Sequence, residues 1–325
     1  MDPSSAPLSA LPPSSEFGAG ETVSMHALTG AGESPATLAR RAGDVTRGAP
    51  PPADPRRSGL LLTYPTTSIL IAINVAIYLL MLPHSPVPLL WRFHQYAQIP
   101  TAPFDVGTLM HFGGSEVVAV IAGHQWWRLL TAAFVHASFL HIAVNLWCLW
   151  NLGLFGEPLL GRWGLAWVYV LTGVAGNLLS LCWSLFTRTD ALVVGASGAI
   201  FGIAGILIIL LSKRRLAMPW EELRALRRQV VLFAVANLAL GLAPQFAPIL
   251  SPAEWARLHV NPGSLPRIDN TAHLGGFFSG LALGLPLFAK MTTGRASYRR
   301  RQRITFAWAA LLLSLAGYAL AKLVR

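Results

Sequence analysis

The chain of 325 residues is 54% hydrophobic and only 12% charged, and its mean hydropathy is +0.51. Soluble domains carry about 25% charged residues, so this composition excludes an ordinary soluble enzyme and favours an integral membrane protein. The net charge of +11 does not indicate nucleic-acid binding, because the basic residues are confined to short segments between apolar runs. Cys148 and Cys182 fall within apolar stretches, so we interpret them as packing residues rather than as a disulfide or metal site.

The N-terminal segment, residues 1 to about 60, is rich in Pro, Ser, Gly and Ala. Such a composition cannot bury a core, so we expect a disordered tail. No apolar stretch follows the initiator methionine, so this segment is not expected to be a secretory signal peptide. Five arginines stand towards its end: Arg40, Arg41, Arg47, Arg56 and Arg57.

Seven apolar runs follow the tail, and most approach the roughly 20 residues that a helix needs to span a bilayer. They cover approximately residues 66–82, 128–152, 163–186, 194–211, 230–243, 270–289 and 304–321. The fifth run is short for a span. These runs predict an all-α protein, a polytopic bundle of transmembrane helices.

Basic residues gather at alternate connections between the runs. The linker after the fourth run holds Lys213, Arg214, Arg215, Arg224, Arg227 and Arg228. The linker after the sixth run holds Lys290, Arg295, Arg299, Arg300, Arg301 and Arg303. The linker between the third and fourth runs, in contrast, has only Arg188. Because basic loops stay in the cytoplasm, we expect a cytoplasmic N-terminus and a C-terminus on the outer side.

Three of the runs carry polar or ionisable residues, which are costly inside a membrane and therefore indicate function. His141 and Asn145 are four residues apart on the second run, so they share one helical face. Ser197 stands near the start of the fourth run and His273 near the start of the sixth. Spans two, four and six all run from outside to inside, so these four side chains are predicted to meet in the outer half of the bilayer.

Glycines with a spacing of four residues accompany this cluster. Gly276, Gly280 and Gly284 repeat on the sixth run, and Gly198 and Gly202 on the fourth. Small residues at this spacing let helix backbones approach closely. Close approach is what a hydrogen bond between a serine and a histidine on two helices requires.

The residue types predict an acyl-transfer site. A serine hydroxyl needs a base to take its proton, so we expect Ser197 to be the nucleophile and His273 the base. The oxyanion needs donors, which Asn145, His141 and the Ser197 N–H could supply. Taken singly, Ser197 is better explained as a packing serine and His273 as a satisfied core histidine, but the two together, at one depth and flanked by glycines, favour catalysis. Asp269 could orient the histidine as a third member, but we interpret it as a helix N-cap.

Four separated motifs resemble those of the rhomboid intramembrane proteases, across roughly residues 61–290. Residues 123–128, GHQWWR, resemble the first-loop Trp-Arg motif, and residues 141–145, HIAVN, the second-helix His-x-x-x-Asn. Residues 195–198, GASG, resemble the Gly-x-Ser-Gly motif around the nucleophile, and residues 272–276, AHLGG, the sixth-helix histidine motif.

A fifth stretch, residues 151–162 with Glu157, is similar to the family's turn between spans two and three. We expect it to have a structural role. The resemblance implies a dyad of Ser197 and His273 without a carboxylate, and oxyanion stabilisation by His141 and Asn145. Supporting positions are Gly195, Gly198, Phe201 and Gly276. The family often has a tyrosine four residues after the serine, and here Phe201 keeps the stacking ring but lacks the hydroxyl. No cofactor is implied.

The resemblance divides the chain into a disordered cytoplasmic tail, 1–60, a core of six transmembrane helices, 61–290, and a basic linker with a seventh helix, 291–325. It implies a multi-pass protein of a bacterial plasma (inner) membrane, whose partners are transmembrane protein substrates and the lipid bilayer, with no nucleic acid. It leaves the oligomeric state open.

Two other classes of protein compete with the protease. A catalytically inactive rhomboid-like protein would bind membrane clients, but inactive relatives lack the serine or the histidine, and this chain has both. A transporter predicts paired broken helices in symmetric halves, and the sequence has no internal repeat.

Overall fold

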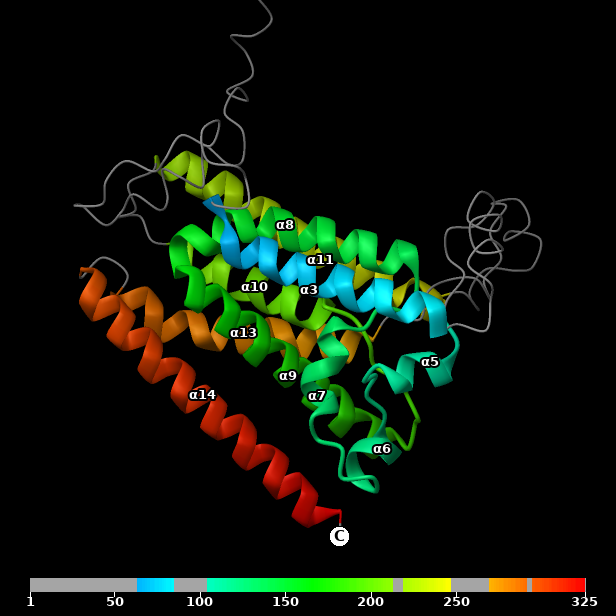
Figure 1. Ribbon diagram of the computed structural model, residues 1–325. Helices are drawn as coiled ribbons and strands as arrows, with labels where there is room; N and C mark the ends of the chain where they lie inside the picture. The colour runs from blue at the N-terminus through cyan, green and yellow to red at the C-terminus, as the bar shows by residue number, and fades with distance from the viewer. Residues whose placement is uncertain (1–62, 85–103, 213–218, 247–268, 291–293, 325) are drawn as a thin grey trace, which may run out of the picture. The chain divides into compact units, whose positions relative to one another are not determined.

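The computed structural model describes residues 63–84, 104–212, 219–246, 269–290 and 294–324 (Figure 1). The predicted tail, 1–60, lies outside these residues. The long helices are α3 (Pro65–Met81), α8 (Phe139–Leu160), α9 (Arg162–Thr187), α11 (Trp220–Phe246), α13 (Asn270–Lys290) and α14 (Arg295–Leu323). Shorter elements are η2 (Leu82–His84), α5 (Val106–His111), α6 (Val117–Ile121), α7 (Arg128–Thr131), η3 (Ala132–Phe134) and α10 (Ser197–Leu210).

The described residues are helical apart from their connections and one isolated antiparallel bridge between Ser115 and Val193. Six of their helices are long and apolar enough to cross a membrane, and α10 is a seventh, shorter apolar helix. The protein is therefore a multi-pass membrane protein, and the predicted all-α bundle of six core helices and one C-terminal helix is confirmed.

Four of the predicted spans have different lengths in the structure. The seventh, 304–321, is longer, because α14 begins at Arg295 and includes most of the basic residues assigned to the preceding linker. The second run, 128–152, is in fact the short elements α7 and η3, and then α8, which begins at Phe139 because the Ser138 side chain accepts the N–H of His141. The fifth run is not short, because α11 continues through the charged stretch before it and reaches 27 residues. The short helix is the fourth, α10, with 14 residues.

The centre of the bundle is α10, in which every residue except Ser197 and Ile209 is buried. Its backbone touches that of α13, since a side chain on Gly276 would overlap the Gly198 carbonyl, and one on Gly280 that of Gly202. The predicted approach of the two helices through glycines is therefore confirmed. It holds α10 and α13 at a fixed separation along their length.

A buried carboxylate fastens the first long helix to the second. Glu157, near the end of α8, accepts the backbone N–H groups of Thr66 and Thr67 at 2.9 Å each and the Thr67 hydroxyl at 2.8 Å. The first N–H groups of a helix have no partner within the helix, and a negative charge there is favourable. The structural role expected for the stretch around Glu157 thus has a clear physical basis.

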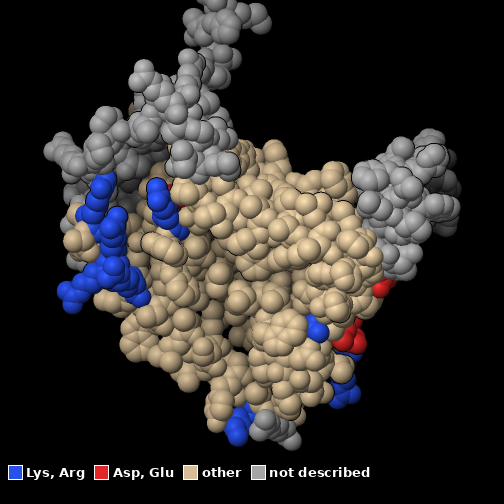
Figure 2. All heavy atoms as spheres, viewed as in Figure 1, with Lys and Arg blue, Asp and Glu red and all other residues tan. Residues whose placement is uncertain are grey.

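The last helix, α14, runs along one side of the bundle (Figure 1). Near its start the Gln302 side chain donates to the Leu160 carbonyl at 2.8 Å, and further along Leu320 packs on the apolar cluster that includes Leu178 and Leu181 of α9. α14 is therefore parallel to α9. Figure 2 shows Lys and Arg side chains gathered at the end of the bundle where α14 begins, whereas the surface between the two ends is almost free of charge on this face.

Candidate active site

Ser197 and His273 lie on adjacent helices near their N-terminal ends. Ser197 is the first residue of α10, and His273 stands in the first turn of α13. The serine hydroxyl oxygen is 2.8 Å from Nε2 of the imidazole. With Nε2 unprotonated, the hydroxyl donates to it, which is the arrangement that proton transfer from serine to histidine requires.

The Phe201 side chain holds one face of this imidazole. Its ring is stacked on His273 at 4.3 Å between centroids and 13° between planes. Phe201 is one helical turn after Ser197, so the same helix presents both the hydroxyl and the stacking ring to the histidine. The stacking expected for this position is present.

The start of α13 is fixed by Asp269. One carboxylate oxygen accepts the N–H groups of Thr271 and Ala272 at 2.9 and 3.1 Å, and the other accepts the Ser180 hydroxyl of α9. The interpretation of Asp269 as an N-cap is therefore confirmed. Within the described part of the chain, Nδ1 of His273 is buried and has no hydrogen-bond partner, so no carboxylate stands behind the imidazole.

The segment before Ser197 is held by hydrogen bonds to the loop region between α5 and α8. Ser115 and Val193 exchange backbone hydrogen bonds of 3.0 and 2.8 Å, and the Gly195 N–H donates to the Ala132 carbonyl at 2.9 Å. Gly195 has a φ of 122°, which residues with a side chain rarely adopt. These contacts fix the direction in which the chain enters α10.

A second histidine completes this support. His136 is fully buried, and its Nε2 accepts the N–H of Ala196 at 3.4 Å, while Nδ1 is 3.3 Å from the Phe134 carbonyl. Burial lowers the pKa of His136 well below its ordinary value, so the ring is neutral and Nδ1–H donates to Phe134. His136 thus supports the backbone immediately before Ser197.

Arg128 orders the loop that supports the segment before Ser197. Its guanidinium donates to the Met110 and Gly114 carbonyls at 2.6 and 2.7 Å and to the Gln125 side chain at 2.6 Å. Gly114 immediately precedes Ser115, the partner of Val193. Arg128 of the Trp-Arg motif thus supports Ser197 indirectly, through the backbone of Gly114 and Ser115.

His141 and Asn145 point to the same place from α8. A Cβ atom on Gly195 would lie 2.7 Å from Nε2 of His141 and 3.8 Å from Nδ2 of Asn145. Nδ1 of His141 accepts the Ala137 N–H at 3.4 Å, which puts the proton of the neutral ring on Nε2. Asn145 uses one of its two N–H groups on the His141 carbonyl, at 3.0 Å, and keeps the other.

The structure thus brings together the four polar residues singled out in the sequence, together with Gly195 and Phe201. Gly198 and Gly276 lie instead on the contact between α10 and α13. The chemical roles of these residues stay predictions. Ser180, a serine on an apolar helix, is predicted by the sequence to form interhelical hydrogen bonds, and it does so with Asp269. Sequence reasoning missed Ala132 and Ser115, which have no visible signal because they act through backbone groups.

Residues 123–290 match the family model described as the Rhomboid domain. The chain is similar to Rhomboid protease GluP of Bacillus subtilis, with 32% identity over 55% of this chain and 30% of that protein. It is also similar to RHOMBOID-like protein 1 of Arabidopsis thaliana, with 32% identity over 60% of this chain and 43% of that protein. Rhomboid-type serine protease 2 of Emericella nidulans is 31% identical over 50% of this chain and 27% of its own length. The chain therefore spans less than half the length of these relatives.

Proposed function

The chain belongs to the rhomboid family, and from this premise we propose that it is an intramembrane serine endopeptidase that cleaves membrane-spanning proteins. The observation that carries the proposal is the 2.8 Å contact between Ser197 Oγ and His273 Nε2, made between two helices within the bundle. Support also comes from two relatives, which are named as a rhomboid protease and as a rhomboid-type serine protease.

The reaction proceeds in two steps. Ser197 Oγ attacks the carbonyl carbon of the scissile peptide bond while its proton passes to Nε2 of His273. The imidazolium then gives this proton to the nitrogen of the leaving segment, the C–N bond breaks, and an ester to Ser197 remains. Water attacks the ester, its proton passes to His273 and on to Ser197 Oγ, and the new carboxyl end is released.

The oxyanion that forms at each step is stabilised by three donors. These are the Nε2–H of His141, the second amide N–H of Asn145 and the backbone N–H of Ser197. The last belongs to the first turn of α10, where N–H groups have no partner within the helix. Donors that are aimed before the reaction begins cost no reorganisation as the charge develops.

The dyad works without a carboxylate because other contacts orient the base. Phe201 restricts the plane of the imidazole by stacking on it. Asp269 fixes the first turn of α13 and, through Ser180, its position relative to α9. The carboxylate therefore contributes by positioning the helix that carries His273, not by a bond to the imidazole.

We extend the proposal to the organisation of the chain in the membrane. Residues 1–60 are a cytoplasmic tail, 61–290 form the protease core, and 291–325 contain the seventh helix, whose first turns from Arg295 carry the basic residues. The N-terminus is cytoplasmic in a bacterial plasma membrane, so the basic end of the bundle faces the cytoplasm and Ser197 opens towards the outer side.

The test is covalent labelling of the purified full chain with a fluorophosphonate probe, alongside cleavage of a single-span model substrate in liposomes. We expect an adduct on Ser197, and loss of cleavage in Ser197→Ala and His273→Ala without loss of thermal stability. Activity of either variant above about a hundredth of wild type would overturn the dyad, because such residues act as a unit. A wild-type protein that retains the substrate without adduct or cleavage would instead be a client-binding rhomboid-like protein.

A further inference from the structure

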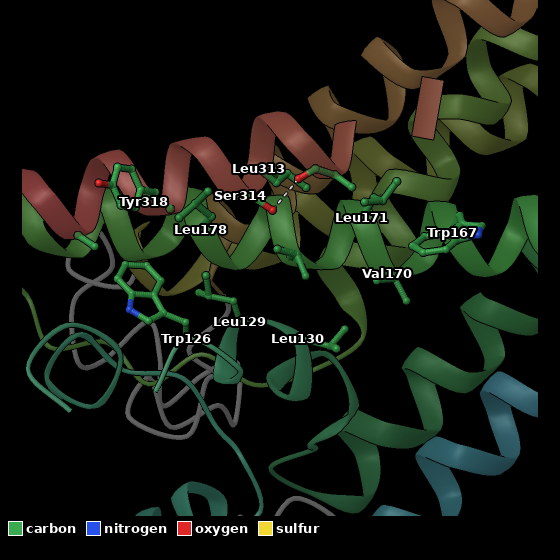
Figure 3. A pocket seen from close by; sticks show the side chains of 14 residues that line it. Trp126, Leu129, Leu130, Trp167, Val170, Leu171, Leu178, Leu313, Ser314 and Tyr318 are labelled. Atoms are coloured by element: carbon green, nitrogen blue, oxygen red, sulfur yellow. Dashed lines mark hydrogen bonds between the residues drawn. The ribbon is translucent and has the colours of Figure 1, made fainter. Parts of the chain in front are cut away.

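An apolar cavity of about 520 Å³ lies between α14 on one side and α9 and the α7 segment on the other (Figure 3). α14 lines it with residues between Ala310 and Ala321, and α9 with residues between Trp167 and Leu178. On the α14 wall, the Ser314 hydroxyl donates to the Ala310 carbonyl of the same helix at 2.9 Å, as Figure 3 shows. The lining of the cavity therefore suits an apolar ligand, and its volume is in the range of small-molecule sites.

We propose that this cavity is a binding site for one acyl chain of a membrane phospholipid. Both of its long walls belong to helices that are long and apolar enough to cross the membrane. None of the residues that line the cavity belongs to the candidate active site. The inference is therefore independent of the proposed protease activity.

A third helix does not fit between the two walls. Leu313 and Leu320 of α14 pack on the apolar cluster that includes Leu178 and Leu181 of α9, so the two helices lie close together along this part of their length. Helices in such contact are about 8–10 Å apart, whereas an inserted helix is itself about 10 Å wide. A substrate helix or a second copy of the chain would have to separate α14 from α9, and a single hydrocarbon chain would not.

The length of the cavity matches one leaflet of a bilayer. The α14 wall runs from residue 310 to residue 321, which is about 17 Å at 1.5 Å per residue. One leaflet is half of a hydrocarbon core of about 30 Å. An acyl chain that lies along this cavity would thus contact protein over the length of a leaflet.

The residues at one end suit a phospholipid headgroup. Trp126 and Tyr318 line the cavity there, and tryptophan and tyrosine are enriched where a membrane meets water. Lys322 follows one turn later, with its Nζ atom 5.7 Å from the centre of the Tyr318 ring. An ammonium group at this place complements a phosphate. The headgroup would therefore lie at Lys322 and the chain would run towards Ala310.

The test uses the full chain in liposomes that contain a phospholipid with a diazirine on one acyl chain. After irradiation, mass spectrometry locates the adducts. We expect them on cavity residues such as Leu313 and Leu178, several-fold above Leu312 and Leu315, which lie on the exposed side of α14. Equal labelling of both sets would mean that only annular lipid is present, and peptide–peptide crosslinks from α14 to a second chain would mean a protein occupant. Either result overturns the proposal.

Two filling variants from opposite walls sharpen the test. Ser314→Trp on α14 and Val174→Phe on α9 should each lower the cavity adducts about tenfold, whereas the matched control Leu315→Trp should leave them unchanged. Lys322→Glu should lower labelling by the phospholipid but not by a diacylglycerol probe, which lacks the phosphate. Unchanged adducts in both filling variants would exclude the site, and equal sensitivity of the two probes to Lys322→Glu would exclude the headgroup assignment.

Discussion

The substitution Gly276→Ala tests whether the contact between α10 and α13 sets the geometry of the dyad. The added methyl group would lie 2.7 Å from the carbonyl carbon of Gly198 and closer still to its oxygen. Carbon atoms pack at about 3.5–4.0 Å, so α13 must move away from α10 by about 1 Å. His273 is one turn before Gly276, so the Ser197–His273 distance of 2.8 Å would lengthen by a similar amount. A misplacement of this size costs roughly 100-fold in rate, and the overpacking costs about 1–3 kcal/mol of stability.

The assay for this prediction is turnover of the single-span substrate, measured together with the thermal unfolding midpoint. The matched control is Gly317→Ala on α14, where the new methyl group would be 3.8 Å from the Trp126 ring, an ordinary contact. We expect that variant to be unchanged in both measurements. If Gly276→Ala keeps its turnover within a factor of two of wild type, the two backbones are not in the contact described and the reasoning fails.

Asn145→Ala should lower turnover about 100-fold or more, as does loss of one oxyanion donor. Asp269→Asn should change turnover far less, because asparagine is an equally good N-cap. A larger loss of turnover in Asp269→Asn than in Asn145→Ala would mean that Asp269 takes part in catalysis. His136→Phe should lower the free energy of unfolding by about 1–3 kcal/mol, because the buried N–H of Ala196 loses its acceptor. An unchanged unfolding midpoint would rule out that hydrogen bond. Reporter fusions should place residues 291–303 in the cytoplasm and residue 325 outside, whereas a cytoplasmic residue 325 would mean a miscounted span.

The helices themselves were largely predictable from the sequence, and the errors have identifiable causes. A run of apolar residues does not distinguish a membrane span from a buried loop, so residues 128–138 were joined to the second helix. The early part of α11 was missed because its charges mask its hydropathy. Leu223, Leu226 and Val230 are nevertheless buried, and their spacing of three and four residues is a helical signal that a hydropathy count does not register.

The polar residues of the candidate site were predictable because the membrane makes them conspicuous. A histidine, asparagine or serine on an apolar helix is rare enough to be noticed, and alternation of the spans then puts several at one depth. The contacts that support these residues could not be predicted in this way. Ala132 and Val193 act through backbone groups, so their residue types do not indicate this role. The bond between Ser180 and Asp269 joins residues 89 positions apart, and only the fold reveals that pairing.

The short length of α10 connects the fold to the proposed reaction. Its 14 residues extend about 21 Å, roughly 9 Å less than a hydrocarbon core of about 30 Å. A helix that reaches one membrane boundary therefore starts well below the other, and non-helical backbone at that depth is tolerated only where protein or water satisfies it. The hydrogen bonds of Val193, Gly195 and Ala196 satisfy it here. In the proposed reaction, the same contacts that allow α10 to be short would place Ser197 at a depth where a substrate helix has to unwind before its peptide carbonyls can be attacked.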